Sequence, residues 1–162
     1  MKIAYKMFSN NFFILLVLLL VMGASNSLLA QTTYYSQGNA YLGITTNWNT
    51  IRTGGGSSPV SIGNDIFVIQ NTHSITNDAT YTINALTVET GGSFINGATS
   101  IGRTININND VTVDGTLDFY RGTINTDGDF SVGTTGRILF AAMNSVFWAS
   151  GFFNNFSNIS LL

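Results

Sequence analysis

A strand–turn–strand unit occurs three times in the second half of the chain. The copies are residues 86–94, 111–119 and 130–140, and each alternates apolar and polar residues, breaks at a glycine turn and alternates again. Equivalent valines in the three copies are separated by 25 and then 19 residues. Short strands that recur about every 20 residues are typical of a coil stacked on itself.

Stacking the copies predicts which side chains lie inside the coil. The expected internal columns are Leu86–Val111–Phe130, Val88–Val113–Val132 and Phe94–Leu117–Ile138, with an external row of Thr87, Thr112 and Ser131 and with glycine turns at 91–92, 115 and 136 along one edge. Residues 104–108 also alternate, with Ile105 and Ile107 inward and Asn106 outward. We therefore predict an all-β fold, a parallel β-helix (β-solenoid). An antiparallel β-sandwich is the alternative, because it also uses short strands at similar spacing.

The first 30 residues have the features of a secretory signal peptide. Lys2 and Lys6 precede an apolar run of eleven residues, 12–22, and a stretch of small residues follows. A helix needs about 20 apolar residues to span a bilayer, so a retained anchor is the less favoured alternative. We expect cleavage after Ala30, with cleavage after Ser27 as the other option.

The rest of the chain divides into two predicted parts. Residues 31–58 place Trp48 and several tyrosines in polar sequence and end in a glycine-rich stretch, which predicts an N-terminal cap and linker over the open end of the coils. An ordered surface loop anchored by Trp48 is the alternative. Residues 59–162 are predicted to form the coils. Because residues 158–162 alternate like the start of another strand, we expect the coils to be incomplete and the chain to be a fragment of a longer protein.

Charge and cysteine content narrow the classes of partner. After residue 30 the chain has four arginines, no lysine and eight acidic residues, a formal net charge of −4. Nucleic acid is an unsuitable partner, because phosphate binding needs several cations on one face, and no membrane span is predicted in the mature chain. The chain has no cysteine, which excludes disulfides and thiol chemistry.

Four aspartates are the candidates for chemistry. Asp114 and Asp118 flank one glycine turn on the predicted outward face, and Asp127 and Asp129 flank another about half a coil later. Paired carboxylates can hydrolyse a glycosidic bond, and these oxygens together with those of residues 108–110 can hold Ca²⁺. Since Asp beside Gly is mostly a turn former, we expect no catalytic residue, no metal ligand and no cofactor. The four aspartates remain candidate binding residues, and Ca²⁺ remains open as a bound ion.

His73 is the only histidine, so a cluster of histidine ligands is excluded. It follows Asn71 and Thr72 in a predicted turn, where we expect a surface corner residue rather than a catalytic base.

Two stretches resemble the N-terminal region of large, secreted β-helix proteins of gliding Gram-negative bacteria that use the type IX secretion route. They are residues 31–39, together with Trp48, and residues 63–76. Members of that group often have glycine where Thr72 stands, so this corner is expected to be built differently. The resemblance implies an adhesin-like protein, secreted or on the outer cell surface, and brings no catalytic residues.

Together these observations predict an extracellular β-helix segment that acts as a structural or adhesive module and is not an enzyme. Its expected partner is polysaccharide or a neighbouring cell surface. The alternative, from another class, is a polysaccharide-degrading β-helix enzyme or a carbohydrate-binding module that uses the four aspartates.

Overall fold

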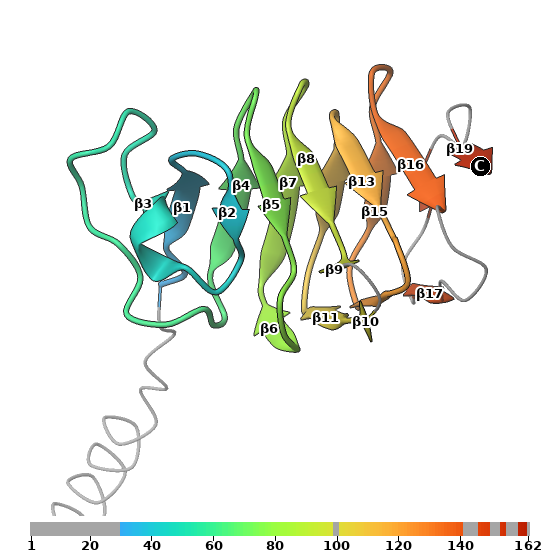
Figure 1. Ribbon diagram of the computed structural model, residues 1–162, viewed down its shortest axis with the longest axis horizontal. Helices are drawn as coiled ribbons and strands as arrows, with labels where there is room; N and C mark the ends of the chain where they lie inside the picture. Colours follow the sequence, from blue (N-terminus) through green and yellow to red (C-terminus); the bar gives the residue numbers. More distant parts are fainter. Residues whose placement is uncertain (1–29, 99–100, 141–145, 150–152, 155–158, 162) are drawn as a thin grey trace, which may run out of the picture. The chain divides into compact units, whose positions relative to one another are not determined.

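The computed structural model describes residues 30–98, 101–140, 146–149, 153–154 and 159–161, with side chains for 30–97 and 101–140. By its internal contacts the chain separates into Met1–Ala30 and Gln31–Leu162. The predicted signal peptide therefore lies, except for Ala30, outside the described residues. The second unit is all-β, and its stacked parallel strands form a β-solenoid (Figure 1). The predicted parallel β-helix is confirmed.

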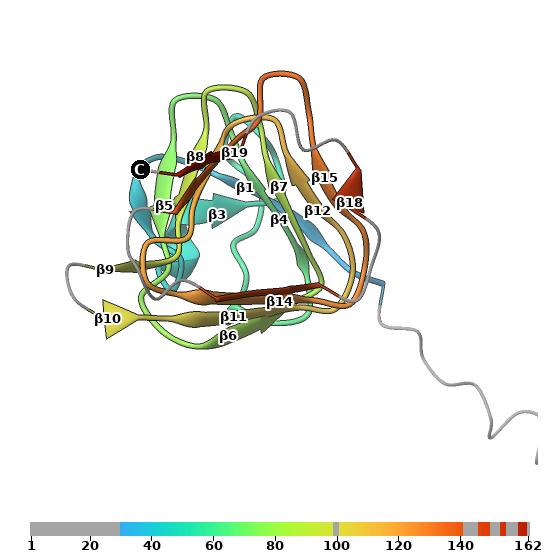
Figure 2. The same ribbon diagram turned by 90° about the vertical axis from the view of Figure 1, so that its right-hand side faces the viewer.

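Three sheets form the sides of a coil that is roughly triangular in cross-section (Figure 2). In spatial order, sheet A contains β18 (Phe153–Asn154), β15 (Phe130–Val132), β12 (Val111–Val113), β7 (Ala85–Val88), β4 (Ile66–Ile69), β1 (Thr33–Ser36) and β3 (Trp48–Asn49). Sheet B contains β19 (Ile159–Leu161), β16 (Arg137–Phe140), β13 (Thr116–Asp118), β8 (Ser93–Ile95), β5 (Ser74–Thr76) and β2 (Ala40–Tyr41). Sheet C contains β17 (Val146–Ala149), β14 (Thr123–Thr126), β11 (Thr104–Ile107) and β6 (Tyr81–Ile83).

The chain passes from sheet A to B to C and returns to A one strand further on, as β12, β13, β14 and β15 do. Within the three sheets, every described pair of neighbouring strands is parallel except β1 with β3. Winding supplies the crossover that parallel strands require. The antiparallel sandwich kept as the alternative is therefore wrong.

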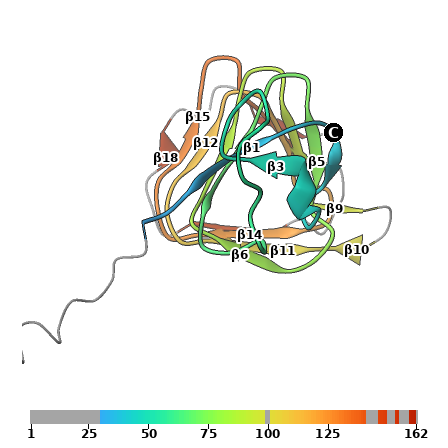
Figure 3. The same cartoon turned by 90° about the vertical axis from the view of Figure 1, so that its left-hand side faces the viewer.

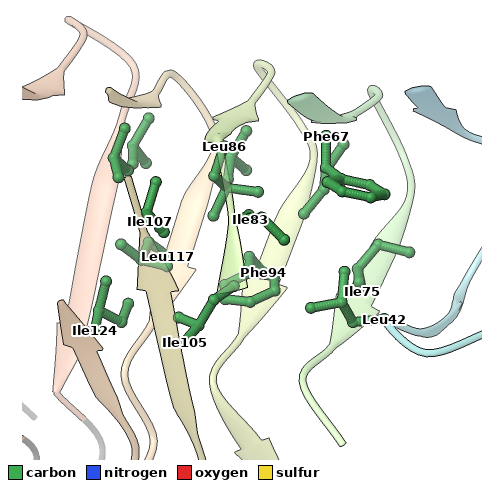
Figure 4. Packing of buried hydrophobic residues seen from close by; sticks show 14 of the residues in the cluster. Leu42, Phe67, Ile75, Ile83, Leu86, Phe94, Ile105, Ile107, Leu117 and Ile124 are labelled. Atoms are coloured by element: carbon green, nitrogen blue, oxygen red, sulfur yellow. The ribbon is translucent and has the colours of Figure 1, made fainter. Parts of the chain in front are cut away.

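The register confirms all three predicted internal columns. Leu117 pairs with Phe94 on one side and Ile138 on the other, and the columns through Val111 and Val113 are aligned in the same way. These side chains are at most 6% exposed and form one continuous core (Figure 4). Ile105 and Ile107 also point inward as predicted. Each buried aliphatic side chain contributes roughly 1.5–3 kcal/mol, so the columns stabilise a chain that has no disulfide.

An inserted hairpin accounts for the irregular period. The strands β9 (Gly97–Ala98) and β10 (Ile101–Gly102) pair antiparallel between β8 and β11. Without such an insertion, β11 and β14 pair residues 19 positions apart, as Thr104 does with Thr123, and so do β4 and β7, as Ile66 does with Ala85. The longer step between β7 and β12 therefore contains the same coil with an outgrowth at the corner between sheets B and C.

Inside that corner, a column of side chains changes from polar to aromatic along the coil. Asn77 and Asn96 are both 0% exposed, and the Asn77 Nδ2 donates to Asn96 Oδ1 at 2.8 Å. The Asn96 Nδ2 donates in turn to the carbonyl oxygen of Thr123 at 3.0 Å. One coil later the rings of Phe119 and Phe140 are stacked, 4.7 Å between centroids.

The N-terminal end of the β-solenoid is covered by the residues that follow β2 (Figure 3). β1 and β2 pair in parallel with β4 and β5, so the first coil begins inside the segment that was expected to be a cap. The chain then forms the short 3-10 helix η1 (Thr45–Asn47) and β3, which pairs with the outer edge of β1. Trp48 is fully buried; its Nε1 donates to the Leu42 carbonyl at 3.0 Å and its ring meets Phe67 edge-on at 4.9 Å.

Candidate functional site

Asp114 lies at the corner between sheets A and B. It is half-buried in the turn after β12, and its carboxylate fills the space that a Cβ on Gly133 of the next coil would need. Its carbonyl oxygen accepts a hydrogen bond from Thr135 Oγ1 at 2.7 Å. The stacked turns of this corner also bring Thr135 Oγ1 to 3.1 Å from Thr90 Oγ1. Asp114 thus packs within the turn.

Asp118 lies at the far end of β13, at the corner between sheets B and C. Its Oδ1 accepts a hydrogen bond from the backbone N–H of Tyr120 at 2.8 Å, and Tyr120 has a φ of +46°. Asp114 precedes β13 and Asp118 ends it, and a strand of three residues is roughly 10 Å long. The two aspartates therefore do not flank a single turn as expected: the turn is short, and Asp118 is the last residue of the sheet B strand that follows it.

Asp127 and Asp129 are exposed at the third corner, between sheets C and A. The Asp129 N–H donates to Asp110 Oδ1 of the preceding coil at 3.0 Å, and the Asp127 N–H donates to the Ile107 carbonyl at 3.0 Å. The four candidate aspartates are therefore distributed over three corners. Among the residues described, no three His, Asp or Glu side chains gather in a way that could hold a metal ion.

His73 lies half-buried at the corner between sheets A and B and contacts a buried hydroxyl that the sequence did not suggest. Its Nδ1 is 2.8 Å from Ser36 Oγ, which also accepts the N–H of Gln70 at 3.0 Å. Ser36 is 0% exposed, so its hydroxyl is not accessible to a substrate. This pair joins the first two coils and has a structural role.

Arg52 forms an interaction that sequence reasoning missed. Its guanidinium binds both carboxylate oxygens of Glu89 and lies over the ring of Tyr35, 4.5 Å from the centroid. The hydrogen bond to Glu89 raises the pKa of Arg52, against a smaller effect of desolvation. Because both side chains are solvent-accessible, the pair is worth little in stability. The pair connects the loop after β3 to Glu89, at the corner that follows β7.

Asp78 and Tyr81 form a second small polar group, at the corner between sheets B and C. Asp78 Oδ1 accepts the N–H of Gly43 at 3.1 Å and the hydroxyl of Tyr81 at 3.2 Å. Burial raises the pKa of the Tyr81 phenol, and the charge of Asp78 raises it further. The group connects the end of the first coil to β6.

The outer faces of the three sheets differ in chemistry. Sheet B carries Asp118 and Arg137 together with the outward apolar residues Ile95 and Leu139. Sheet A carries the predicted row of Thr87, Thr112 and Ser131, and the register confirms this row. Sheet C carries two rows, Thr104–Thr123 and Thr82–Asn106–Asn125. The second row was visible in the sequence as the repeated Thr-Ile-Asn of residues 104–106 and 123–125.

No helix in the described part of the chain is long and apolar enough to cross a membrane. The chain matches no protein-family model, no curated protein and no solved structure.

Proposed function

We propose that the chain is an extracellular or cell-surface β-helix segment that acts as a structural and adhesive module. Its partner is polysaccharide or a neighbouring cell surface. The observation that carries this proposal is the contrast between the two kinds of surface group. Hydroxyl and amide side chains form regular rows on the sheets, whereas the four candidate carboxylates are spread over three corners. At these corners Asp118, and Asp110 beside the candidates, accept hydrogen bonds from the turns.

The extracellular location in this proposal comes from the sequence. The first 30 residues have the order of charge, apolar run and small residues of a signal peptide. The resemblance of residues 31–39 and 63–76 to secreted β-helix proteins of the type IX group points to the same location. Mass spectrometry of the protein recovered from culture medium and from the cell surface tests this, with a mature N-terminus at Gln31 as the expected result. An N-terminus at Met1, found in the membrane fraction, would contradict it.

The adhesive role is tested by retention. The purified protein is applied to immobilised neutral and acidic polysaccharides and to whole bacterial cells, with serum albumin, which is also acidic, as the control. We expect retention on at least one of these surfaces well above that of albumin. Retention no greater than that of albumin on every polysaccharide and on cells contradicts the adhesive function.

A further inference from the structure

We propose that sheet C is the face that binds, and that its ligand is an uncharged polysaccharide; this inference rests on the adhesive function proposed above. The strands β6, β11 and β14 place apolar residues inside, with Ile105 and Ile124 both 0% exposed. The alternation leaves two outward residues on each of β11 and β14, whereas β12 and β15 in sheet A each leave one. At these coils sheet C thus has a wider outer face than sheet A; β8 and β13 in sheet B also leave two outward residues each, but that face is charged.

The chemistry of this face fits a ligand without charge. On β6, β11 and β14 its outward residues are Thr82, Thr104, Asn106, Thr123 and Asn125, and none of them is charged. Sheet B, by contrast, has the charged residues Asp118 and Arg137 on its outer face. On the strands of sheet C an acidic polysaccharide would lose hydration without gaining a counter-charge, which is unfavourable; Arg103 and Arg121 lie before β11 and β14, at the corner between sheets B and C. The hydroxyl groups of a neutral polysaccharide can replace their hydrogen bonds to water by hydrogen bonds to the protein.

The amides on this face are already held in position. Asn125 Nδ2 donates to Asn106 Oδ1 at 2.8 Å, and Asn106 Nδ2 lies 3.5 Å from Thr82 Oγ1. A side-chain amide has two N–H donors and an oxygen with two lone pairs, so the ladder leaves Asn106 with hydrogen-bonding capacity toward the solvent. Because the ladder restricts the side chains before binding, less conformational entropy is lost when a ligand binds.

The spacing of the rows suits a repeating ligand better than a single sugar. Neighbouring strands in a sheet are about 4.8 Å apart, and outward residues on one strand are roughly 6.6 Å apart. The two rows therefore form a regular grid that runs along the coil axis. An extended polysaccharide can place successive sugar units against successive strands, and many weak contacts then add up.

The test compares two sets of substitutions that keep strand propensity. The sheet C variant carries Thr104→Val, Asn106→Val, Thr123→Val and Asn125→Val, and the matched control carries Thr87→Val and Thr112→Val on sheet A. Retention is measured by affinity electrophoresis and pull-down with neutral glucan, mannan and chitin, and with alginate and pectate as acidic probes. We expect the sheet C variant to bind the neutral polysaccharides about tenfold more weakly or worse, and the control to bind as the wild type does. Circular dichroism and thermal unfolding check the fold, and the pair Thr104→Val and Thr123→Val replaces the full set if that set does not fold.

The outcomes separate this inference from the proposed function. Unchanged binding by a folded sheet C variant, loss of binding in the sheet A control, or a preference of the wild type for alginate or pectate overturns the role of sheet C while leaving the adhesive function in place. Self-association through sheet C, seen as a change in oligomeric state between wild type and variant without polysaccharide binding, also overturns it. Failure of the wild type to bind any polysaccharide or cell removes the adhesive function, and this inference with it.

Discussion

Thr72 is a β-branched residue in a backbone conformation that favours glycine. Its φ is +67°, and the equivalent position one coil later is Gly91, with a φ of +80°. The Thr72 N–H donates to the Gly91 carbonyl at 3.1 Å, so the two turns stack directly. The resemblance to secreted β-helix proteins led us to expect a differently built corner at Thr72. The backbone instead keeps the conformation that suits glycine, and the threonine is strained in it.

We predict that Thr72→Gly raises the free energy of unfolding by about 1 kcal/mol. The substitution relieves strain of about 1–3 kcal/mol, partly offset because glycine loses about 0.5–1 kcal/mol more conformational entropy on folding. Urea unfolding measures the change as a shift of the midpoint at constant slope. Thr87→Gly, inside β7, is the matched control and is expected to lower the midpoint. If both variants are destabilised alike, Thr72 is not strained.

The raised pKa of Tyr81 predicts a loss of stability at alkaline pH. Burial, and then the charge of Asp78, keep the phenol protonated in the folded state above its ordinary pKa of about 10. The contribution of Tyr81 to stability is therefore complete below about pH 10 and is lost as the pH rises through its folded pKa. Thermal unfolding between pH 8 and pH 11 should show a falling midpoint, and Tyr81→Phe should make this fall shallower.

Tyr41→Phe provides the comparison for this experiment. Tyr41 is 52% exposed, so the substitution removes a phenol that the fold does not bury. We expect the pH profile of Tyr41→Phe to follow that of the wild type. If Tyr81→Phe also follows it, the alkaline loss arises elsewhere.

At the scale of strands and turns, the sequence predicts the apolar columns because alternation and the glycine turns fix both the face and the register. Aligning the three copies of the repeat was enough to predict the internal column of Val88, Val113 and Val132. The first coil was not predicted, because the loop between β3 and β4 makes β1 and β4 pair residues 33 positions apart. The distribution of the four candidate aspartates over three corners was not predicted, for a related reason. Closeness in sequence does not reveal that Asp114 lies at one corner and Asp118 at the far end of the strand that follows it.

The buried asparagines were also missed, since Asn before Asp or Gly predicts a turn. The available signal was their separation of 19 residues, which equals the coil period. Asn96 bridges Asn77 and the Thr123 carbonyl, whereas the Oδ1 of Asn77 has no hydrogen-bond partner in the described structure. The side chain of Asn96 therefore makes more hydrogen bonds than that of Asn77, and we expect it to contribute more to stability.

We predict that Asn96→Leu costs about 2–4 kcal/mol, because it leaves the Asn77 amide buried without its partner and removes the side-chain hydrogen bond to the Thr123 carbonyl. The double variant Asn77→Leu and Asn96→Leu should recover part of this loss, since no buried amide is then left without its partner and the column becomes apolar from Leu42 to Phe119. Denaturant unfolding of the single and double variants measures the coupling between the two sites. Additive losses would show that the two asparagines do not act as a ladder.

At the scale of the whole coil, stability is approximately a sum of contacts between neighbouring coils. The N-terminal end is closed by Trp48, which contacts both Leu42 and Phe67. Residues in the middle, such as Leu117, have a coil on each side. The local unfolding caused by a substitution at the end should therefore extend over different coils from that caused by a substitution in the middle.

We predict that Trp48→Ala, which costs about 3–5 kcal/mol, opens the first coils and leaves the later ones protected. In hydrogen exchange, the amides of β1 and β4 should exchange faster than in the wild type, while those of β12 and β15 should change little. Leu117→Ala is the matched comparison, because it makes a cavity of comparable cost, about 2–5 kcal/mol, with neighbours on both sides, and should accelerate exchange in β7 as well as β15. Equal acceleration of all strands by Trp48→Ala would mean that the coil unfolds as a single unit, and that the covering of its N-terminal end stabilises the whole stack rather than its first turns.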